Sequence, residues 1–274
     1  MKLAAALLAL AATPACADPL VDFLAGQGCT IGPESRAAAL AAGFDAAAID
    51  ALIAETLADG RASQQRDYVL LDAATCTIRL PDIASPYTVN SPEIRAITSA
   101  IDAFAAEGEP GCFLQDATQA FDRMKGGARG AGFDSYMAFL GAGLVAGDLA
   151  FYKPSPLQTP VSLQVISGDC AQVPNIEAIR RSHAFIAQGF GDYIRLKGAE
   201  TLCGEEDWSQ GAMDFAVTVQ GADPAADPAT QPEINAWLWF EYDLIAMAAG
   251  WRLGMTGTEK GIARPPLCHY PAGG

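Results

Sequence analysis

The sequence has little positive charge and almost no histidine. It contains 17 Lys and Arg against 32 Asp and Glu, which gives the 274-residue chain a formal net charge of −15. A surface this acidic repels nucleic acids and anionic lipids, so we expect neither as a partner. The two histidines, His183 and His269, are far apart, and no C-x-x-C pair is present. Zinc sites use closely spaced ligand pairs, so we expect no metal site, and no motif indicates a cofactor.

Motifs of nucleophilic and phosphate-binding enzymes are also missing. The sequence contains neither G-x-S-x-G nor S-x-x-K. A glycine-rich stretch at 125–132 carries two cations and precedes a predicted helix, where it could hold an anion. Its spacing matches neither G-x-G-x-x-G nor a P-loop, and Asp134 would compete with the anion at the helix start. We therefore interpret this stretch as a turn.

The mature chain also lacks a long apolar run free of charge. The best candidate for a membrane span, 234–251, carries Glu241 and Asp243 near its middle. Charged residues at that depth are costly in lipid, so we expect no membrane span.

Residues 1–17 have the layout of a secretory signal peptide. Lys2 precedes an apolar run over 3–12, and Ala15-Cys16-Ala17 is a small-residue cleavage motif. We predict cleavage near Ala17 and export to a periplasm or to the extracellular medium. An alternative is that Cys16 carries a lipid anchor. The residues Thr13-Pro14-Ala15 lack the large aliphatic side chain of a lipoprotein signal, so we do not expect one.

Six cysteines remain once Cys16 is assigned to the signal: Cys29, Cys76, Cys112, Cys170, Cys203 and Cys268. An even number of cysteines in an exported chain predicts three disulfides, although the sequence permits many pairings. Matching flanks, Cys-Thr-Ile in both cases, favour a Cys29–Cys76 bridge. Cys268 lies in a tail whose nearest free partner is Cys203, and this leaves Cys112 with Cys170. We favour this set of nearest neighbours.

Helical periodicity dominates the sequence. We predict helices over 33–41, 46–57, 92–104, 113–124, 134–150 and 176–190, and a last long helix that starts at Pro232-Glu233. Alternating patterns predict strands at 161–165 and 213–219. The expected fold is mainly α, rich in helical hairpins, with a small antiparallel β element. We expect 18–274 to form a single disulfide-stabilised globular domain, which could divide at the proline-rich stretch 153–160.

Two ionisable residues, Glu241 and His183, fall in the apolar faces of the predicted helices. A buried ionisable group must find a partner or change its protonation state. The two could form a pair that acts as general base and orienter, or Glu241 could be an acid of high pKa. The favoured interpretation is a structural hydrogen bond between helices, or an ion pair of Glu241 with Arg180, Arg181 or Arg252.

Three tryptophans, Trp237, Trp239 and Trp251, crowd the region of Glu241. Aromatic rings beside a carboxyl group are typical of a sugar-binding cleft, and Glu241 could then serve as the general acid of a cell-wall or glycan hydrolase. Glycoside hydrolysis usually needs a second carboxylate, and none can be identified here. We therefore expect a non-catalytic protein that binds a protein or a small-molecule ligand, and we keep the hydrolase as the alternative.

Overall fold

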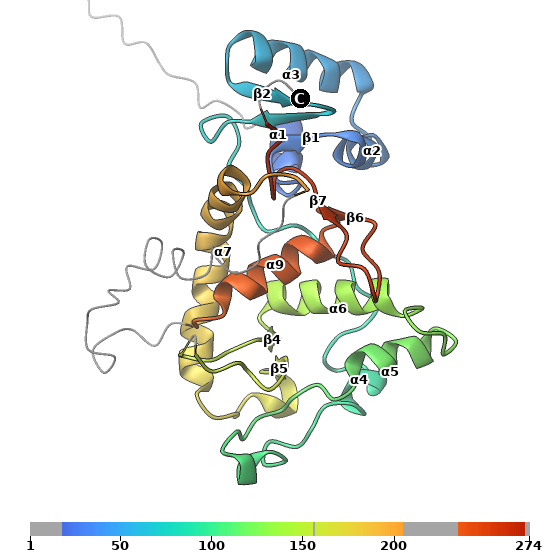
Figure 1. The fold of residues 1–274 in the computed structure, drawn as a ribbon, viewed down its shortest axis with the longest axis vertical. Helices are drawn as coiled ribbons and strands as arrows, with labels where there is room; N and C mark the ends of the chain where they lie inside the picture. The colour runs from blue at the N-terminus through green and yellow to red at the C-terminus, as the bar shows by residue number, and fades with distance from the viewer. Residues whose placement is uncertain (1–17, 156, 205–234, 272–274) are drawn as a thin grey trace, which may run out of the picture.

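The computed structural model describes residues 18–155, 157–204 and 235–271 (Figure 1). The predicted signal at 1–17, the predicted strand at 213–219 and the predicted helix start at Pro232-Glu233 lie outside these residues. The described part contains eight α-helices and three small antiparallel sheets. The described part is therefore mainly helical, but it contains three small sheets where we expected a single small β element. None of the described helices combines the length and the apolar character needed to cross a membrane.

The N-terminal part combines three helices with a three-stranded sheet of order β1-β3-β2. Its elements are α1 (Pro19–Ala25), β1 (Thr30–Ile31), α2 (Pro33–Ala41), α3 (Ala46–Ala58), β2 (Ala62–Gln65) and β3 (Tyr68–Leu71). Both neighbours of β3 run antiparallel to it, with Thr30 opposite Leu70 and Gln64 opposite Val69. Sequence analysis did not predict this sheet, because its strands are only two to four residues long.

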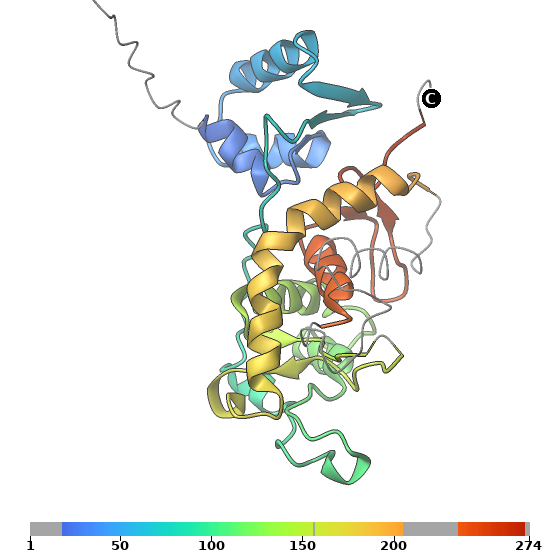
Figure 2. The same cartoon turned by 90° about the vertical axis from the view of Figure 1, so that its left-hand side faces the viewer.

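The remaining elements form the larger part of the molecule, which an irregular segment between Leu71 and Pro92 connects to the N-terminal part (Figures 1 and 2). In chain order they are α4 (Pro92–Arg95), the 3-10 turn η1 (Ala105–Glu107), α5 (Ala117–Met124), α6 (Phe133–Ala146), β4 (Leu149–Ala150), β5 (Gln164–Val165), the 3-10 turn η2 (Gly168–Cys170), α7 (Ile176–Glu200), α9 (Leu238–Ala248), β6 (Arg252–Leu253) and β7 (Ile262–Ala263). β4 pairs with β5, and β6 pairs with β7.

Helices α2 and α3 confirm the predictions made for 33–41 and 46–57. Proline occupies the first turn of α2, where its missing N–H costs nothing. The Asp45 carboxylate accepts the N–H of Ala47 and so caps the start of α3. Both starts are controlled by residues within one turn of the helix, and this is why the sequence alone could locate them.

The prediction of a helix over 92–104 is wrong, because α4 ends at Arg95. Thr98 instead forms a β-bridge with Leu114, and the Ser99 N–H donates to the Phe113 carbonyl at 2.9 Å. The prediction for 113–124 begins too early for the same reason, since Phe113 also bridges Gln164 and α5 starts only at Ala117. Pairing between distant segments overrides the helical periodicity here.

Three other predicted elements have different lengths. The helix predicted over 134–150 ends at Ala146, because Gly147 adopts a left-handed conformation with φ of 73° and closes it. The strand predicted at 161–165 is reduced to β5. The helix predicted over 176–190 starts at Ile176 as expected and continues to Glu200 as α7.

The core of the larger part is built on α6 and α9, which lie side by side in both views (Figures 1 and 2). The long helix α7 packs against α9. Leu140 and Leu144 of α6 and Tyr242 and Ile245 of α9 are at most 2% exposed. This packing fixes the position of every group on α9, including Glu241.

The structure contains the three bridges of the nearest-neighbour set: Cys29–Cys76, Cys112–Cys170 and Cys203–Cys268. They close loops of 47, 58 and 65 residues, and each is worth roughly 4 kcal/mol in the chain-entropy model. Three disulfides fit an oxidising compartment.

The C-terminal tail is held between the N-terminal part and α7. Arg264 is 2% exposed and lies 3.7 Å from the Glu34 carboxylate of α2. Pro266 passes so close to α7 that a Cβ on Gly198 would fall 2.2 Å from its carbonyl oxygen. Cys268 then joins the tail to Cys203, just beyond the end of α7. The tail therefore connects the two parts of the molecule.

We predict that Gly198→Ala destabilises the protein. A Gly→Ala change at an open helical site stabilises by about 1 kcal/mol, but here the new methyl group would meet a backbone carbonyl. We expect the free energy of unfolding to fall by roughly 1–3 kcal/mol, measured in guanidinium with the disulfides intact. Gln188→Ala, at an exposed position of the same helix, is the control and should change little. A gain in stability for Gly198→Ala would contradict the close approach.

Candidate functional site

Glu241 lies in the first turn of α9 and is only 3% exposed. Its Oε1 accepts the N–H of Phe151 at 2.6 Å, and the Asn235 side chain provides a second hydrogen bond. Burial raises the pKa of Glu241 from its ordinary value of 4.5 to about 8, although both hydrogen bonds act in the opposite direction. Burial thus favours the protonated, uncharged form of this carboxyl group.

Asn235 belongs to the same hydrogen-bond network as Glu241. Its Oδ1 accepts the N–H groups of Lys153 at 3.2 Å and Trp237 at 3.1 Å, and its Nδ2 donates to the Phe151 carbonyl at 3.0 Å. Glu241 and Asn235 together satisfy the backbone of the segment that follows β4. The hydrogen bonds of Glu241 are structural, but they go to Asn235 and to a backbone amide outside the helices, whereas we had favoured a bond between helices or an ion pair with Arg180, Arg181 or Arg252.

The structure gives His183 and Glu241 different neighbours. The His183 ring lies against the end of α6, where a Cβ on Gly147 would fall 2.6 Å from Nε2. Burial lowers the pKa of His183, and the nearby Asp148 carboxylate partly offsets this effect. Its Nδ1 is buried and forms no hydrogen bond with the described residues. The two candidate residues are not brought together as a base and its orienter.

The three tryptophans also lie in different parts of the structure. Trp237 and Trp239 are half-buried and stack with their ring centroids 5.9 Å apart, and Phe151 packs edge-on against Trp237. Trp251 is fully buried, and the centroid of its ring lies 5.8 Å from that of Phe190 in α7. Trp251 therefore belongs to the core and cannot face a ligand from the same surface as the other two.

The glycine-rich stretch 125–132 is organised by a carboxylate of the chain itself. Asp122 accepts the N–H groups of Gly130 and Gly132, both at 2.9 Å. These two hydrogen bonds hold the pKa of Asp122 below its usual value. An internal carboxylate thus occupies the position that an anion would take, and the stretch is a turn.

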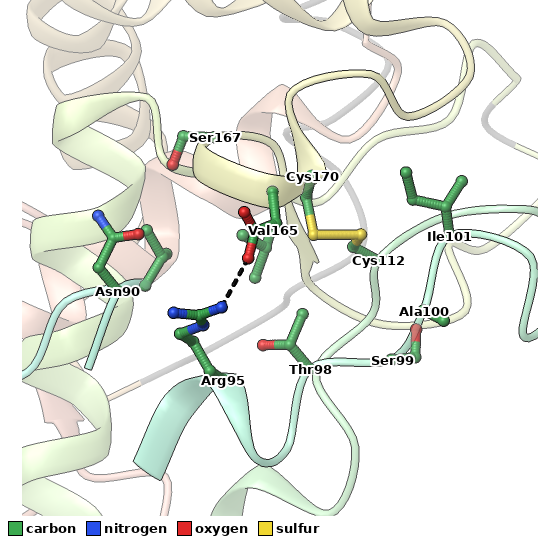
Figure 3. Close-up of a pocket in the computed structure, with 12 residues that line it drawn as sticks. Asn90, Arg95, Thr98, Ser99, Ala100, Ile101, Cys112, Val165, Ser167 and Cys170 are labelled. Atoms are coloured by element: carbon green, nitrogen blue, oxygen red, sulfur yellow. Dashed lines mark hydrogen bonds and ion pairs between the residues drawn. A yellow bond between two sulfur atoms is a disulfide. The ribbon is translucent and has the colours of Figure 1, made fainter. Parts of the chain in front are cut away.

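A hollow of about 370 Å³ lies beside the Cys112–Cys170 disulfide, and we call it the Arg95 hollow (Figure 3). Its lining comes from α4, from the irregular segment that follows α4, from β5 and from η2. The residues that matter for its chemistry are Arg95, Thr98, Ile101, Val165, Ser167 and Asp169. Its volume lies near the lower end of small-molecule sites, roughly 300–1,000 Å³.

An ion pair spans the Arg95 hollow. Arg95 Nη2 lies 2.8 Å from Asp169 Oδ2, and the two side chains are 63% and 84% exposed. Figure 3 shows Arg95 between Asn90 and Thr98, with the disulfide above and to the right of them in this view. A pair this exposed contributes little to stability, so a ligand could open it at small cost.

The inner surface of the hollow combines apolar and polar groups. Val165 is buried and its N–H donates to the Cys112 carbonyl, so it lies next to the disulfide, and the buried Val89 also lines the hollow. The Ser99 hydroxyl is already committed to Phe113 N and Gly111 O. Ser167 Oγ is buried and forms no hydrogen bond with any described residue. Ser167 therefore retains an unused donor and acceptor in the wall of the hollow.

Two wider hollows, of about 550 and 570 Å³, lie beside α1. The arginines that line these two hollows already form ion pairs with neighbouring carboxylates. Arg79 bonds both the carboxylate and the carbonyl oxygen of Asp22, and Arg61 bonds Glu55 and Asp59. Arg95 has a single recorded oxygen partner in the described structure. This difference makes the Arg95 hollow the stronger candidate for a ligand.

Sequence analysis missed the Arg95 hollow. Its residues are scattered between 89 and 170, and part of them fell in a predicted helix that does not form. The one usable signal was the predicted Cys112–Cys170 pairing, which places two loops next to each other. Comparison of the chain with protein-family models, with curated proteins and with solved structures finds no match.

We predict that Glu241 makes the stability of the protein depend on pH. Because its pKa is raised in the folded state, the stability it contributes is complete below pH 4.5 and is lost as pH rises to about 8. The expected loss is roughly 1.4 kcal/mol per pH unit within that window. Glu241→Gln keeps an acceptor for Phe151 N and should remove this slope.

The measurement is denaturant unfolding at several pH values between 5 and 9. Glu200→Gln, at an exposed position of α7, is the matched control and should retain the wild-type slope. Parallel curves for wild type and Glu241→Gln would show that Glu241 does not titrate in this range.

Proposed function

We propose that this chain is a non-catalytic binding protein that accepts a small-molecule ligand in the Arg95 hollow. The observation that supports it most directly is the Arg95–Asp169 ion pair, which spans a hollow with apolar walls. Charged groups at the mouth and apolar surface inside are the usual composition of a small-molecule site.

The lining of the hollow favours binding over catalysis. The residues described there include no histidine, lysine or glutamate, and both cysteines are in a disulfide. The carboxylate of the lining, Asp169, has its Oδ2 on Arg95 rather than on a serine hydroxyl. The hollow therefore offers a charged pair suited to recognition rather than a carboxylate aligned on a nucleophile.

The hydrolase alternative has less support. It would need Glu241 to reach a sugar, whereas this carboxyl is shielded and bonded to Phe151 N. Its raised pKa suits a general acid, but burial beside a backbone amide explains it equally well. Glycoside hydrolysis usually needs a second carboxylate, and the partners of Glu241 within the described part of the chain are Phe151 and Asn235.

The proposed compartment is the periplasm or the extracellular medium. The three disulfides support an oxidising environment, and the predicted signal at 1–17 is consistent with export.

We predict that Ala100→Trp abolishes ligand binding. Ala100 is exposed at the hollow, so a tryptophan there would fill it without disturbing the core. The assay is thermal unfolding with a panel of small acids, amines, amino acids and neutral alcohols. A ligand at 100 times its Kd stabilises a protein by about 2.7 kcal/mol, which gives a clear rise in Tm.

The control variant is Ala103→Trp, an exposed alanine of the same segment that does not line the hollow. We expect at least one class of compound to stabilise the wild type and Ala103→Trp but not Ala100→Trp. If no class stabilises the wild type, or if Ala100→Trp binds as well as the wild type, the proposed site is wrong.

A further inference from the structure

We propose that the Arg95 hollow selects zwitterions of the α-amino-acid class, with the ligand carboxylate on Arg95 and the ligand ammonium on Asp169. This inference rests on the proposed function and names the ligand class of the same site. It follows from the charge, the hydrogen-bonding state and the apolar surface of a few lining residues.

The first argument is charge balance. Arg95 and Asp169 come from segments 74 residues apart and meet across the hollow. A ligand that enters between them separates the pair. A simple anion on Arg95 would lie beside the Asp169 carboxylate and be repelled by it, and a simple cation on Asp169 would be repelled by Arg95. A zwitterion replaces both halves of the ion pair and leaves neither charge unpaired.

The second argument is the unused capacity of Arg95. A guanidinium has five N–H donors in a planar fork that fits a carboxylate with two parallel hydrogen bonds. In the described structure Arg95 uses this fork for a single contact with Asp169. Since both side chains are more than half exposed, neither is held in its present position by surrounding atoms. The fork can therefore turn toward a ligand carboxylate.

The third argument concerns the interior of the hollow. Val165 is 3% exposed and lies next to the disulfide, and Val89, 5% exposed, is a second apolar residue of the lining. An aliphatic side chain of the ligand would contact this surface. Ser167 Oγ, buried and without a partner among the described residues, could bond a polar atom of the ligand. At about 370 Å³ the hollow suits a molecule of this small size.

The experiment compares three probes that share one aliphatic chain and differ only in charge. They are leucine, 4-methylpentanoate, which lacks the amine, and isoamylamine, which lacks the carboxylate. Each is titrated into the full mature chain by isothermal calorimetry at pH 7. We expect saturable binding of leucine and binding weaker by about tenfold or more for each singly charged probe.

Two variants test which residues bind the two charges of the ligand. Arg95→Gln and Asp169→Asn should each weaken leucine binding by about tenfold or more, because each leaves one ligand charge unpaired. Arg36→Gln and Asp50→Asn are the matched controls, since Arg36 and Asp50 form another exposed ion pair at 2.7 Å, between α2 and α3. Both controls should bind leucine like the wild type.

The outcomes separate this inference from the proposed function. If 4-methylpentanoate or isoamylamine binds as tightly as leucine and Ala100→Trp abolishes that binding, the hollow is a ligand site, but its assignment to zwitterionic ligands is wrong. The assignment to zwitterionic ligands is equally wrong if leucine binding is unchanged in Arg95→Gln and Asp169→Asn. If none of the three probes binds and the wider panel also fails, both proposals are overturned.

Discussion

The Cys112–Cys170 disulfide is the constraint on which the Arg95 hollow depends. It joins the irregular segment near 112 to η2, and η2 carries Asp169 next to Cys170. Arg95 lies at the end of a helix of only four residues. Elements this short have too few internal hydrogen bonds to keep their own geometry. The covalent bridge therefore supplies the rigidity that a long helix would otherwise give to the site.

Buried acids elsewhere in the molecule act as partners for the backbone. Asp122 holds two N–H groups of the glycine-rich turn, and Glu241 holds the N–H of Phe151 after β4. Their electrostatics differ: hydrogen bonds dominate at Asp122 and lower its pKa, whereas burial dominates at Glu241 and raises its pKa. In both cases the carboxyl group satisfies loop amides that no strand could pair.

The sequence predicts those features that a few adjacent residues control. The Asp45 cap located α3, and similar flanks indicated the Cys29–Cys76 bridge. The sequence could not predict contacts between distant segments, such as the bridge of Thr98 to Leu114 or the bond of Glu241 to a backbone amide 90 residues earlier. The burial of Glu241 followed from helical periodicity, but its partners did not. The Arg95 hollow is built almost wholly from distant contacts, which explains why it emerged only from the structure.

The acidic character of the chain explains why Asp169 matters as much as Arg95 in the proposed site. A solitary arginine beside an apolar hollow would accept any small carboxylate, since the guanidinium fork fits them all. Asp169 competes with such anions for Arg95 and repels them, in keeping with the net charge of −15. A ligand that brings its own ammonium group removes this penalty. Selectivity in such a site arises from a repulsive group as much as from an attractive one. The exposed ion pair, which adds little to stability, is therefore well suited to discriminate among ligands.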